Sequence, residues 1–228
     1  MMRRILSVII CLGLLGIPSV RAEAPKYVAL TFDDGPSGRF TSRLLEGLEE
    51  RSVQATFLLC GYRLAAYPEL AKQIHRAGHE IGLHGYSHRS FATLSERELE
   101  KELADTQKLL PEGCGAVFLR PPGGIGSQMV EQVAEKMGLA LLLWSVDPRD
   151  WAIHDAAAVE TAVVSQVQDG DVILLHDLSD SSVDAALSII DRLQKEGFRF
   201  VTVSRLAALR GIALLPGKTY KCFPAGDG

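Results

Sequence analysis

The stretch YVALTFDDGPS, residues 27–37, joins an apolar run to two adjacent carboxylates and a Gly-Pro turn. The apolar, β-branched and aromatic residues at its start predict a buried strand over residues 27–32. Successive strand residues point to opposite faces, so Asp33 and Asp34 are equivalent only if the chain turns, and Gly35-Pro36 supplies a turn. Adjacent like charges also need a cation nearby to remain ionised. The stretch therefore predicts a strand that ends in two acids with different tasks.

Strand-like runs alternate with amphipathic, helix-like segments along the rest of the chain. The strand candidates are residues 27–32, 55–60, 80–84, 116–120, 140–146, 171–176 and 198–203. The clearest helix candidates are residues 41–51, 68–78, 95–110 and 181–197. This alternation predicts parallel βα units with right-handed crossovers in one domain, either a barrel or an open doubly wound sheet. No dinucleotide loop is expected after the first strand, because acids stand where a phosphate would bind.

The N-terminus has the anatomy of a secretory signal peptide. MMRR is followed by the apolar residues 5–17 and by PSVRA, which ends at Ala22. We expect a leader over residues 1–22, a mature domain over residues 23–228, and a secreted or cell-envelope location with no stable membrane partner. An uncleaved membrane anchor is the alternative, although the apolar core is short for a membrane span.

Charge and cysteine content limit the partners and the redox chemistry. The formal net charge is −4 and no basic run is visible, which argues against a nucleic-acid partner. Beyond the leader stand Cys60, Cys114 and Cys222, and an oxidising compartment permits one disulfide. We expect Cys60 to be a buried small hydrophobe and Cys114 to pair with Cys222. None of them has the spacing of a zinc knuckle.

Polar side chains stand at or just after the ends of several predicted strands. They are Asp33, Asp34, His84, His88, Arg120, Asp147, Asp150 and His176. In parallel α/β folds the carboxyl ends of all strands share one face, and that face holds the reaction site. We therefore expect these side chains to lie close together at that face.

Two histidines at this face suggest a metal site. His84 and His88 have the four-residue spacing that places two imidazoles on one side of a helical turn. His75 and His79 have the same spacing, but Gly78 is expected to end their helix and neither follows a strand, so a surface and a structural role are predicted for them. Two histidines and one carboxylate leave positions open for water and substrate, as a catalytic divalent-metal site requires.

Such a site needs a base and an acid. A divalent cation lowers the pKa of bound water from about 15.7 to roughly 7. One of the two adjacent acids can bind the metal while the other takes the proton, with Arg120 keeping it ionised. His176 is then placed to protonate a leaving group. Either Asp147 or Asp150 is expected to set its tautomer and raise its pKa, and the other to cap a loop.

Five motifs follow one another along the chain: TFDDGPS, HGYSH, RPPGG, DPRDW and LLH. In this order they resemble the polysaccharide deacetylases of carbohydrate esterase family four, the chitooligosaccharide-deacetylase-like domain, from about Tyr27 to Leu206. The resemblance implies a distorted (β/α) barrel with seven or eight mostly parallel strands. It also implies metal-dependent removal of N-acetyl groups from amino sugars.

The motifs imply a role for each of these residues at the strand ends. Asp33 resembles the base, Arg120 its partner, and His176 the acid, tuned by Asp147 or Asp150. The implied metal ligands are Asp34, His84 and His88. Zinc is the expected metal, although the same ligands accommodate cobalt, nickel, manganese or iron.

The RPPGG and DPRDW motifs imply contacts to the substrate. Pro122 and Gly123 are expected beside it, with the Gly123 N–H and the metal stabilising an oxyanion. The chain departs from the family at Gly85, where Thr or Ser is common, and at Gly123, where Tyr or Phe is common. The second change removes an aromatic wall beside the sugar. Trp151 is either a replacement wall or a core aromatic.

These inferences predict a secreted, metal-dependent N-deacetylase of peptidoglycan or a chitin-like oligosaccharide, acting as a monomer. A metal-bound water would attack the acetyl carbonyl, with Asp33 as base and His176 as acid. Two alternatives remain open. One is an O-acetyl esterase acting on an acetylated polysaccharide, and the other is a non-catalytic relative that binds glycans.

Overall fold

The computed structural model describes residues 25–226 of the 228-residue chain. The leader predicted over residues 1–22 therefore lies outside the described residues. Within residues 25–226, none of the helices combines the length and the apolar character that crossing a membrane requires.

The described chain alternates strands and helices, as the sequence predicts. The strands are β1 (Lys26–Asp33), β2 (Thr56–Leu59), β3 (Glu80–Leu83), β4 (Phe118–Leu119), β5 (Ala140–Leu142), β6 (Val172–His176), β7 (Phe198–Phe200) and β8 (Thr219–Tyr220). The helices are α1 (Gly38–Glu50), α2 (Gly61–Ala66), α3 (Pro68–Arg76), α4 (Glu96–Gln107), α5 (Gln128–Lys136), α6 (Ala156–Val164), α7 (Asp180–Lys195) and α8 (Val203–Leu209), with short 3-10 turns at Phe91–Thr93 and Pro122–Gly124.

The strands form one eight-stranded sheet in the order β6-β1-β2-β3-β4-β5-β8, and β7 pairs with the first residues of β1. All of these strand pairs are parallel. The segment after β5 reaches β6 through an isolated parallel bridge between Val146 and Ile173. The sheet therefore curls until its two sides meet, which confirms the predicted distorted (β/α) barrel.

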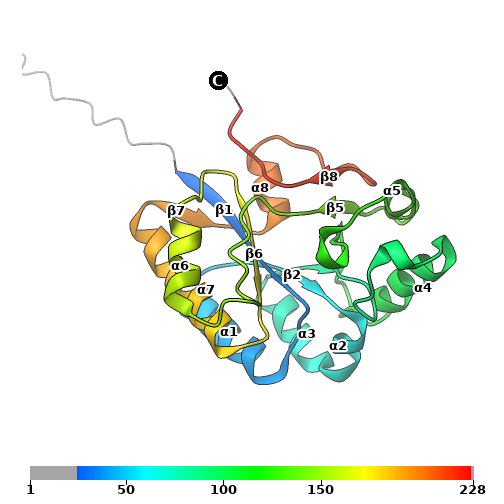
Figure 1. Ribbon diagram of the computed structural model, residues 1–228, viewed down its shortest axis with the longest axis horizontal. Helices are drawn as coiled ribbons and strands as arrows, with labels where there is room; N and C mark the ends of the chain where they lie inside the picture. The colour runs from blue at the N-terminus through cyan, green and yellow to red at the C-terminus, as the bar shows by residue number, and fades with distance from the viewer. Residues whose placement is uncertain (1–24, 227–228) are drawn as a thin grey trace, which may run out of the picture.

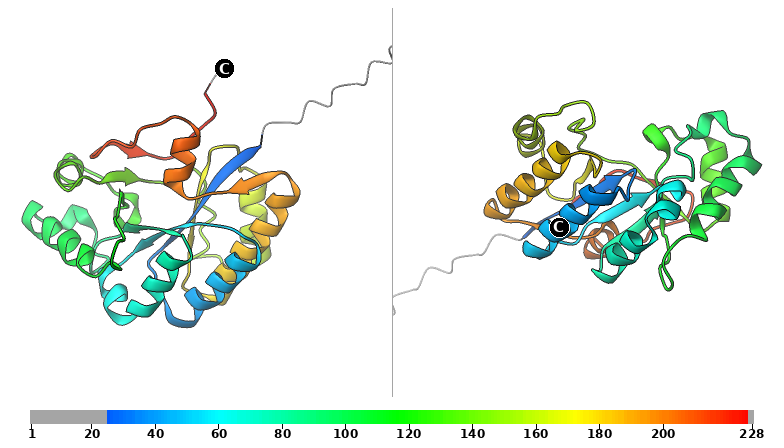
Figure 2. Two further views of the ribbon diagram at one scale, coloured as in Figure 1. Left: turned by 180° about the vertical axis from the view of Figure 1, so that it is seen from behind. Right: turned by 90° about the horizontal axis from the view of Figure 1, so that it is seen from below.

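The helices cover the outside of this curled sheet. In Figure 1, α1, α6 and α7 gather on one side of the barrel, and α4 and α5 lie together on the other. Figure 2 shows the same grouping from behind and from below. Because the strands are parallel, their carboxyl ends share one face of the barrel.

The sequence of β1 explains its central place in the sheet. Residues 28–33 are buried in succession, as expected for a parallel strand that is covered on both faces. The ring of Phe32 stacks on that of Phe57 in β2, with 5.2 Å between the centroids. The run YVALTF therefore predicts the centre of the fold correctly.

The local sequence explains where several helices begin, including helices that the apolar patterns did not predict. A capping box of Ser95 and Glu98 begins α4, which buries Leu99 and Leu103. The helices α5, α6 and α8 were not predicted, although each is capped by a side chain that accepts backbone N–H bonds: Ser127, Asp155 and Thr202. These helices have only nine, nine and seven residues.

The predicted disulfide is wrong, because Cys60, Cys114 and Cys222 are all free thiols. Cys114 lies before β4 and packs against the core beside Leu110. Cys222 follows β8, and its backbone forms an isolated antiparallel bridge with Asp171, directly before β6. Cys60 is fully buried as predicted, and burial raises the pKa of its thiol.

Candidate active site

Asp33 is the last residue of β1 and is held by a fully buried arginine. Arg120, which follows β4, donates from Nη1 to Asp33 Oδ1 at 2.6 Å and to Thr31 Oγ1 at 2.9 Å. Its remaining nitrogens donate to the carbonyls of Leu142 and Leu143 at 3.1 and 2.9 Å. The guanidinium is therefore fixed on several sides, and it fixes one oxygen of Asp33. The other oxygen, Oδ2, lies 3.8 Å from His84 Nε2.

Asp34 differs from its neighbour because the backbone turns. Its φ of +72° lies in the left-handed region, which non-glycine residues adopt at a cost of about 1–2 kcal/mol. The turn directs its Oδ1 toward His84 Nε2 at 3.3 Å and His88 Nε2 at 3.1 Å. Burial raises the pKa of Asp34, but the two imidazoles beside its carboxylate outweigh burial and hold that pKa well below its ordinary value.

The two histidines stand at the ends of a loop rather than on a helical turn, so that part of the prediction is wrong. Gly85 and His88 have positive φ angles of 78° and 58°, and residues 84–88 contain no helix. The rings still face each other, with 5.1 Å between their centroids. The four-residue spacing predicted that the two rings would lie close together, but the positive φ angles decide their relative orientation.

The residues fit a divalent cation. His84 Nδ1 lies 2.7 Å from the carbonyl of Arg120, which can only accept, so this nitrogen holds the proton and Nε2 presents a lone pair. Facing that lone pair is Asp34 Oδ1, a buried oxygen with no hydrogen-bond donor. One ligand atom from each of Asp34, His84 and His88 lies within 4.8 Å of the other two. A cation between them would satisfy these lone pairs, and two histidines with one carboxylate are ligands that zinc accepts.

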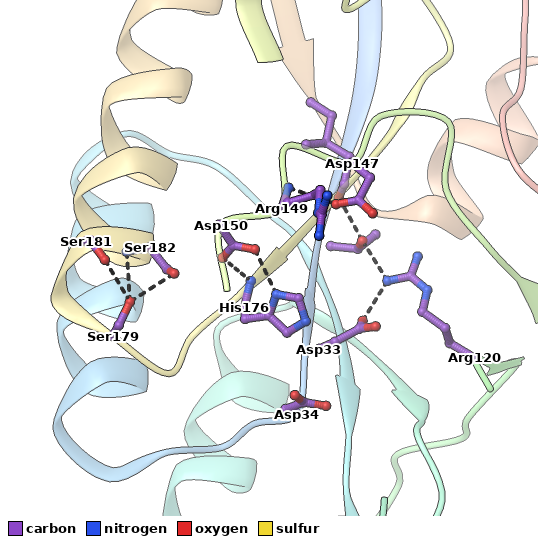
Figure 3. Close-up of polar contacts among 12 residues, drawn as sticks. Asp33, Asp34, Arg120, Asp147, Arg149, Asp150, His176, Ser179, Ser181 and Ser182 are labelled. Carbon is purple, nitrogen blue, oxygen red and sulfur yellow. Dashed lines mark hydrogen bonds and ion pairs between the residues drawn. The ribbon is translucent and has the colours of Figure 1, made fainter. Parts of the chain in front are cut away.

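His176 closes β6 beside this group. In the parallel register its Cα pairs with that of Asp33, so the two side chains are neighbours on adjacent strands. Its Nδ1 lies 2.8 Å from Asp150 Oδ1, and its backbone N–H donates to Asp150 Oδ2 at 2.9 Å (Figure 3). Burial lowers the pKa of His176, but the hydrogen bond and charge of Asp150, with the charges of Asp33 and Asp34, raise it to about 9.

The two acids of DPRDW have different roles, as predicted, although the sequence did not show which acid has which role. Asp150 is buried against His176. Asp147 is exposed, and its Oδ1 accepts the N–H of Arg149 at 2.9 Å, an Asx turn that caps the loop. Asp150 is therefore the residue positioned to tune His176.

Replacing Asp150 by Asn is expected to lower the pKa of His176 from about 9 toward its ordinary value of 6.5, because the negative partner is lost while burial remains. The measurement is an NMR titration of the imidazole C–H signals. The signal of His79 in the same spectra, and the Asp147→Asn variant, are controls that should not move. An unchanged His176 titration in Asp150→Asn would show that other charges set this pKa.

Asp33, His176 and the three metal-ligand candidates all line one cavity of about 360 Å³. Its lining residues are Asp33, Asp34, His84, His88, Gly123, Trp144, Asp147, Trp151, Leu174 and His176. Trp151 is 54% exposed, so it is not a core aromatic. Pro122 is buried and does not line the cavity, unlike Gly123. Sequence reasoning missed Trp144 and Leu174, although both stand at the carboxyl side of predicted strands, where the rule that found the other residues applies equally.

The second histidine pair lies away from this cavity. His79 is buried, accepts the N–H of Ala55 on Nδ1, and has its pKa lowered to about 4 by burial. His75 lies on α3 and is partly buried. The structural role predicted for His79 is confirmed, and neither ring belongs to the metal-ligand group.

The motifs and this geometry coincide with a known family. The family model described as polysaccharide deacetylase matches residues 21–142, which include both acids of β1, both histidines of the loop and Arg120. The chain belongs to the polysaccharide deacetylase family. The predicted resemblance and the assignment as a hydrolase of this family are thereby confirmed.

Individual relatives agree with the family model. A peptidoglycan-N-acetylglucosamine deacetylase of Bacillus cereus is 38% identical over 187 residues, covering 79% of this chain and 88% of that protein. The peptidoglycan-N-acetylmuramic acid deacetylase PdaC of Bacillus subtilis is also 38% identical, and the matched part spans only 39% of its length. Among solved structures, a family 4 acetyl xylan esterase from Clostridium thermocellum with a cobalt ion aligns with a TM-score of 0.81 and 32% identity, over 87% of this chain and all of that one.

Proposed function

We propose that this member of the polysaccharide deacetylase family is an extracytoplasmic, metal-dependent hydrolase that removes N-acetyl groups from amino-sugar polymers, with peptidoglycan as the first candidate and chitin-like oligosaccharides as the second. The observation that carries the proposal is the meeting, in one cavity, of three residues that could hold a metal with a carboxylate fixed by Arg120 and a histidine bonded to Asp150. The signal-peptide pattern supports action outside the cytoplasm.

A divalent cation held by Asp34, His84 and His88 would lower the pKa of water and polarise the acetyl carbonyl. The first task of the protein's own groups is to remove a proton from the attacking water. Asp33 is suited to this task because Arg120 holds its Oδ1 and leaves Oδ2 facing the ligand group. The buried guanidinium of Arg120 also fixes the orientation of the carboxylate that would act as base.

The second task is to protonate the departing nitrogen. An amide releases its amine only when that nitrogen is protonated, so the acid must still hold its proton at the working pH. Asp150 supports this, because it contributes to raising the pKa of His176 to about 9 and orients the ring through Nδ1, while its other oxygen accepts the backbone N–H of His176. The free Nε2 of that ring is then the proton donor.

The rest of the cavity is suited to a sugar ring. Trp144 and Trp151 both line it, and indole faces pack well against the apolar faces of pyranose rings. We expect Trp151 to form the aromatic wall that the glycine at position 123 does not supply. The backbone N–H of Gly123 is the proposed donor to the developing oxyanion.

The preference for peptidoglycan rests on relatives. The Bacillus cereus relative is named for N-acetylglucosamine in peptidoglycan and covers most of this chain. The second candidate function, an O-acetyl esterase, is favoured by the acetyl xylan esterase of similar structure. An ester carbonyl fits the same groups, and its alcohol leaves with less help from an acid. The complete set of base, acid and ligands argues against a non-catalytic glycan-binding role.

The test is acetate release, with mass spectrometry of the products, from a panel of muropeptides, chitin oligomers and acetylated xylan on one preparation. We expect a loss of 42 mass units per acetyl group from the amino sugars, with faster turnover of muropeptides than of xylan. Turnover of xylan alone would instead support the esterase. Binding to the glycans without acetate release from any of them would support the non-catalytic alternative.

A further inference from the structure

The loop HGYSH, residues 84–88, has a metal-ligand candidate at each end. Between His84 and His88 the backbone is irregular, since Gly85 and His88 both have left-handed φ angles. A loop of this kind has no hydrogen bonds of its own to hold its shape. His84 is held by its own N–H, which donates to Leu59, and by its Nδ1 contact with Arg120. Whatever holds the middle residues of the loop therefore controls how the imidazole of His88 meets Asp34.

The N–H groups of this loop are held by a single carboxylate from α4. Glu102 Oε2 accepts the N–H groups of Tyr86 and Ser87 at 2.7 and 2.8 Å. Its other oxygen, Oε1, accepts the hydroxyl of Ser87 at 2.8 Å. Both oxygens of Glu102 are thus directed at the middle of the loop, between the two histidines.

The carbonyl groups of the same loop are held from the opposite direction. The N–H groups of Gly61 and Tyr62, at the start of α2, donate to the carbonyls of Gly85 and Tyr86, both at 3.0 Å. The loop is therefore clamped between α2, which supplies donors, and Glu102, which supplies acceptors. The α2 side consists of backbone groups, so Glu102 is the part of the clamp that a substitution can remove.

Space around the loop explains why this external clamp is needed. A Cβ at Gly85 would lie 3.0 Å from the ring of Phe91, and the φ of +78° is strained for any other residue. No side chain at position 85 is therefore available to hold the loop from inside. The loop depends on contacts from neighbouring helices.

We propose that Glu102 is a positioning residue for the metal site, which fixes the middle of the loop so that the imidazole of His88 is directed at Asp34 beside that of His84. The proposal rests on the metal-dependent function proposed above. Residues that orient metal ligands typically contribute 10–100-fold to metal affinity. The negative charge of Glu102 adds a further attraction for a cation.

The proposal is tested by binding of Zn²⁺ alone to metal-free protein, measured by calorimetry or by competition with a chromogenic chelator. The Glu102→Ala variant is expected to bind Zn²⁺ about 10–100-fold more weakly than the wild type. Glu102→Gln keeps an oxygen for the two N–H groups and turns its amide toward the Ser87 hydroxyl, which can accept, so it should recover most of that loss. Asp105→Ala is the matched control on α4, because Asp105 contacts only exposed lysines there.

Thermal unfolding of the metal-free variants separates positioning from a general loss of stability. If Glu102→Ala lowers the stability of the metal-free protein but binds Zn²⁺ as tightly as the wild type, Glu102 is only a structural contact and the proposal is wrong. If Glu102→Ala does not fold, Ser87→Ala, which removes the hydroxyl contact alone, must weaken Zn²⁺ binding by a few-fold. Unchanged binding in Ser87→Ala would then overturn the proposal. Absence of Zn²⁺ binding to the wild type would overturn this proposal together with the proposed function.

Discussion

Replacing Asp33 by Asn is expected to lower kcat for deacetylation by about 10²–10⁴-fold, the usual contribution of a general base. The amide keeps an oxygen to accept the bond from Arg120, but it cannot take a proton from water. The neighbouring ligand group is untouched. Steady-state kinetics on N-acetylglucosamine oligomers measure the loss, and calorimetry with the same oligomers should show glycan binding unchanged.

The matched control for this prediction is Asp147→Asn. Asp147 lines the same cavity, but it is exposed and only caps its loop, so we expect kcat to stay within about threefold of the wild type. An Asp33→Asn variant as active as its parent would contradict the assignment of the base. A large loss in both variants would point to the overall charge of the cavity instead.

Replacing His176 by Ala is expected to affect amides far more than esters. Loss of the acid should lower kcat on an N-acetyl amino sugar by about 10²–10⁴-fold, because the amine cannot leave unprotonated. On an activated acetyl ester, such as 4-nitrophenyl acetate, the leaving group needs no proton and we expect a loss below about tenfold. The ratio of the two rates, measured for each variant on one preparation, is the decisive quantity.

A matched control for His176 is His154→Ala, because His154 is exposed and lies outside the cavity. It should leave both rates near those of the wild type. Equal losses on the amide and the ester in His176→Ala would mean that His176 acts before the leaving group departs. The assignment of the acid would then be wrong.

The convergence of the site was predictable because it follows from the fold class. Parallel strands place their carboxyl ends on one face, so Asp33 at the end of β1 and His176 at the end of β6 were expected on the same face, and the structure pairs them. The strands themselves were predictable because each is an apolar run. By contrast, β8 has only two residues and no such run, so it left no pattern to recognise.

Other features depend on backbone angles and long-range contacts that residue spacing does not encode. The separation of Asp147 from Asp150 is decided within a single loop, where either acid could have faced His176. The HGYSH loop resembled a helical turn in its spacing, but two left-handed residues prevent a helix. Glu102 was read as part of an amphipathic helix, and its role becomes visible only when α4 meets that loop. The disulfide failed for the same reason, since cysteine number says nothing about proximity.

Metal dependence is the central claim, and acetate release before and after metal removal tests it most directly. The enzyme would be treated with a chelator, shown by elemental analysis to be metal-free, and assayed on N-acetylglucosamine oligomers with and without added Zn²⁺ or Co²⁺. We predict a loss of at least about a hundredfold on metal removal and recovery on re-addition, with one new amine per acetate released. Full activity in protein shown to be metal-free would contradict the account.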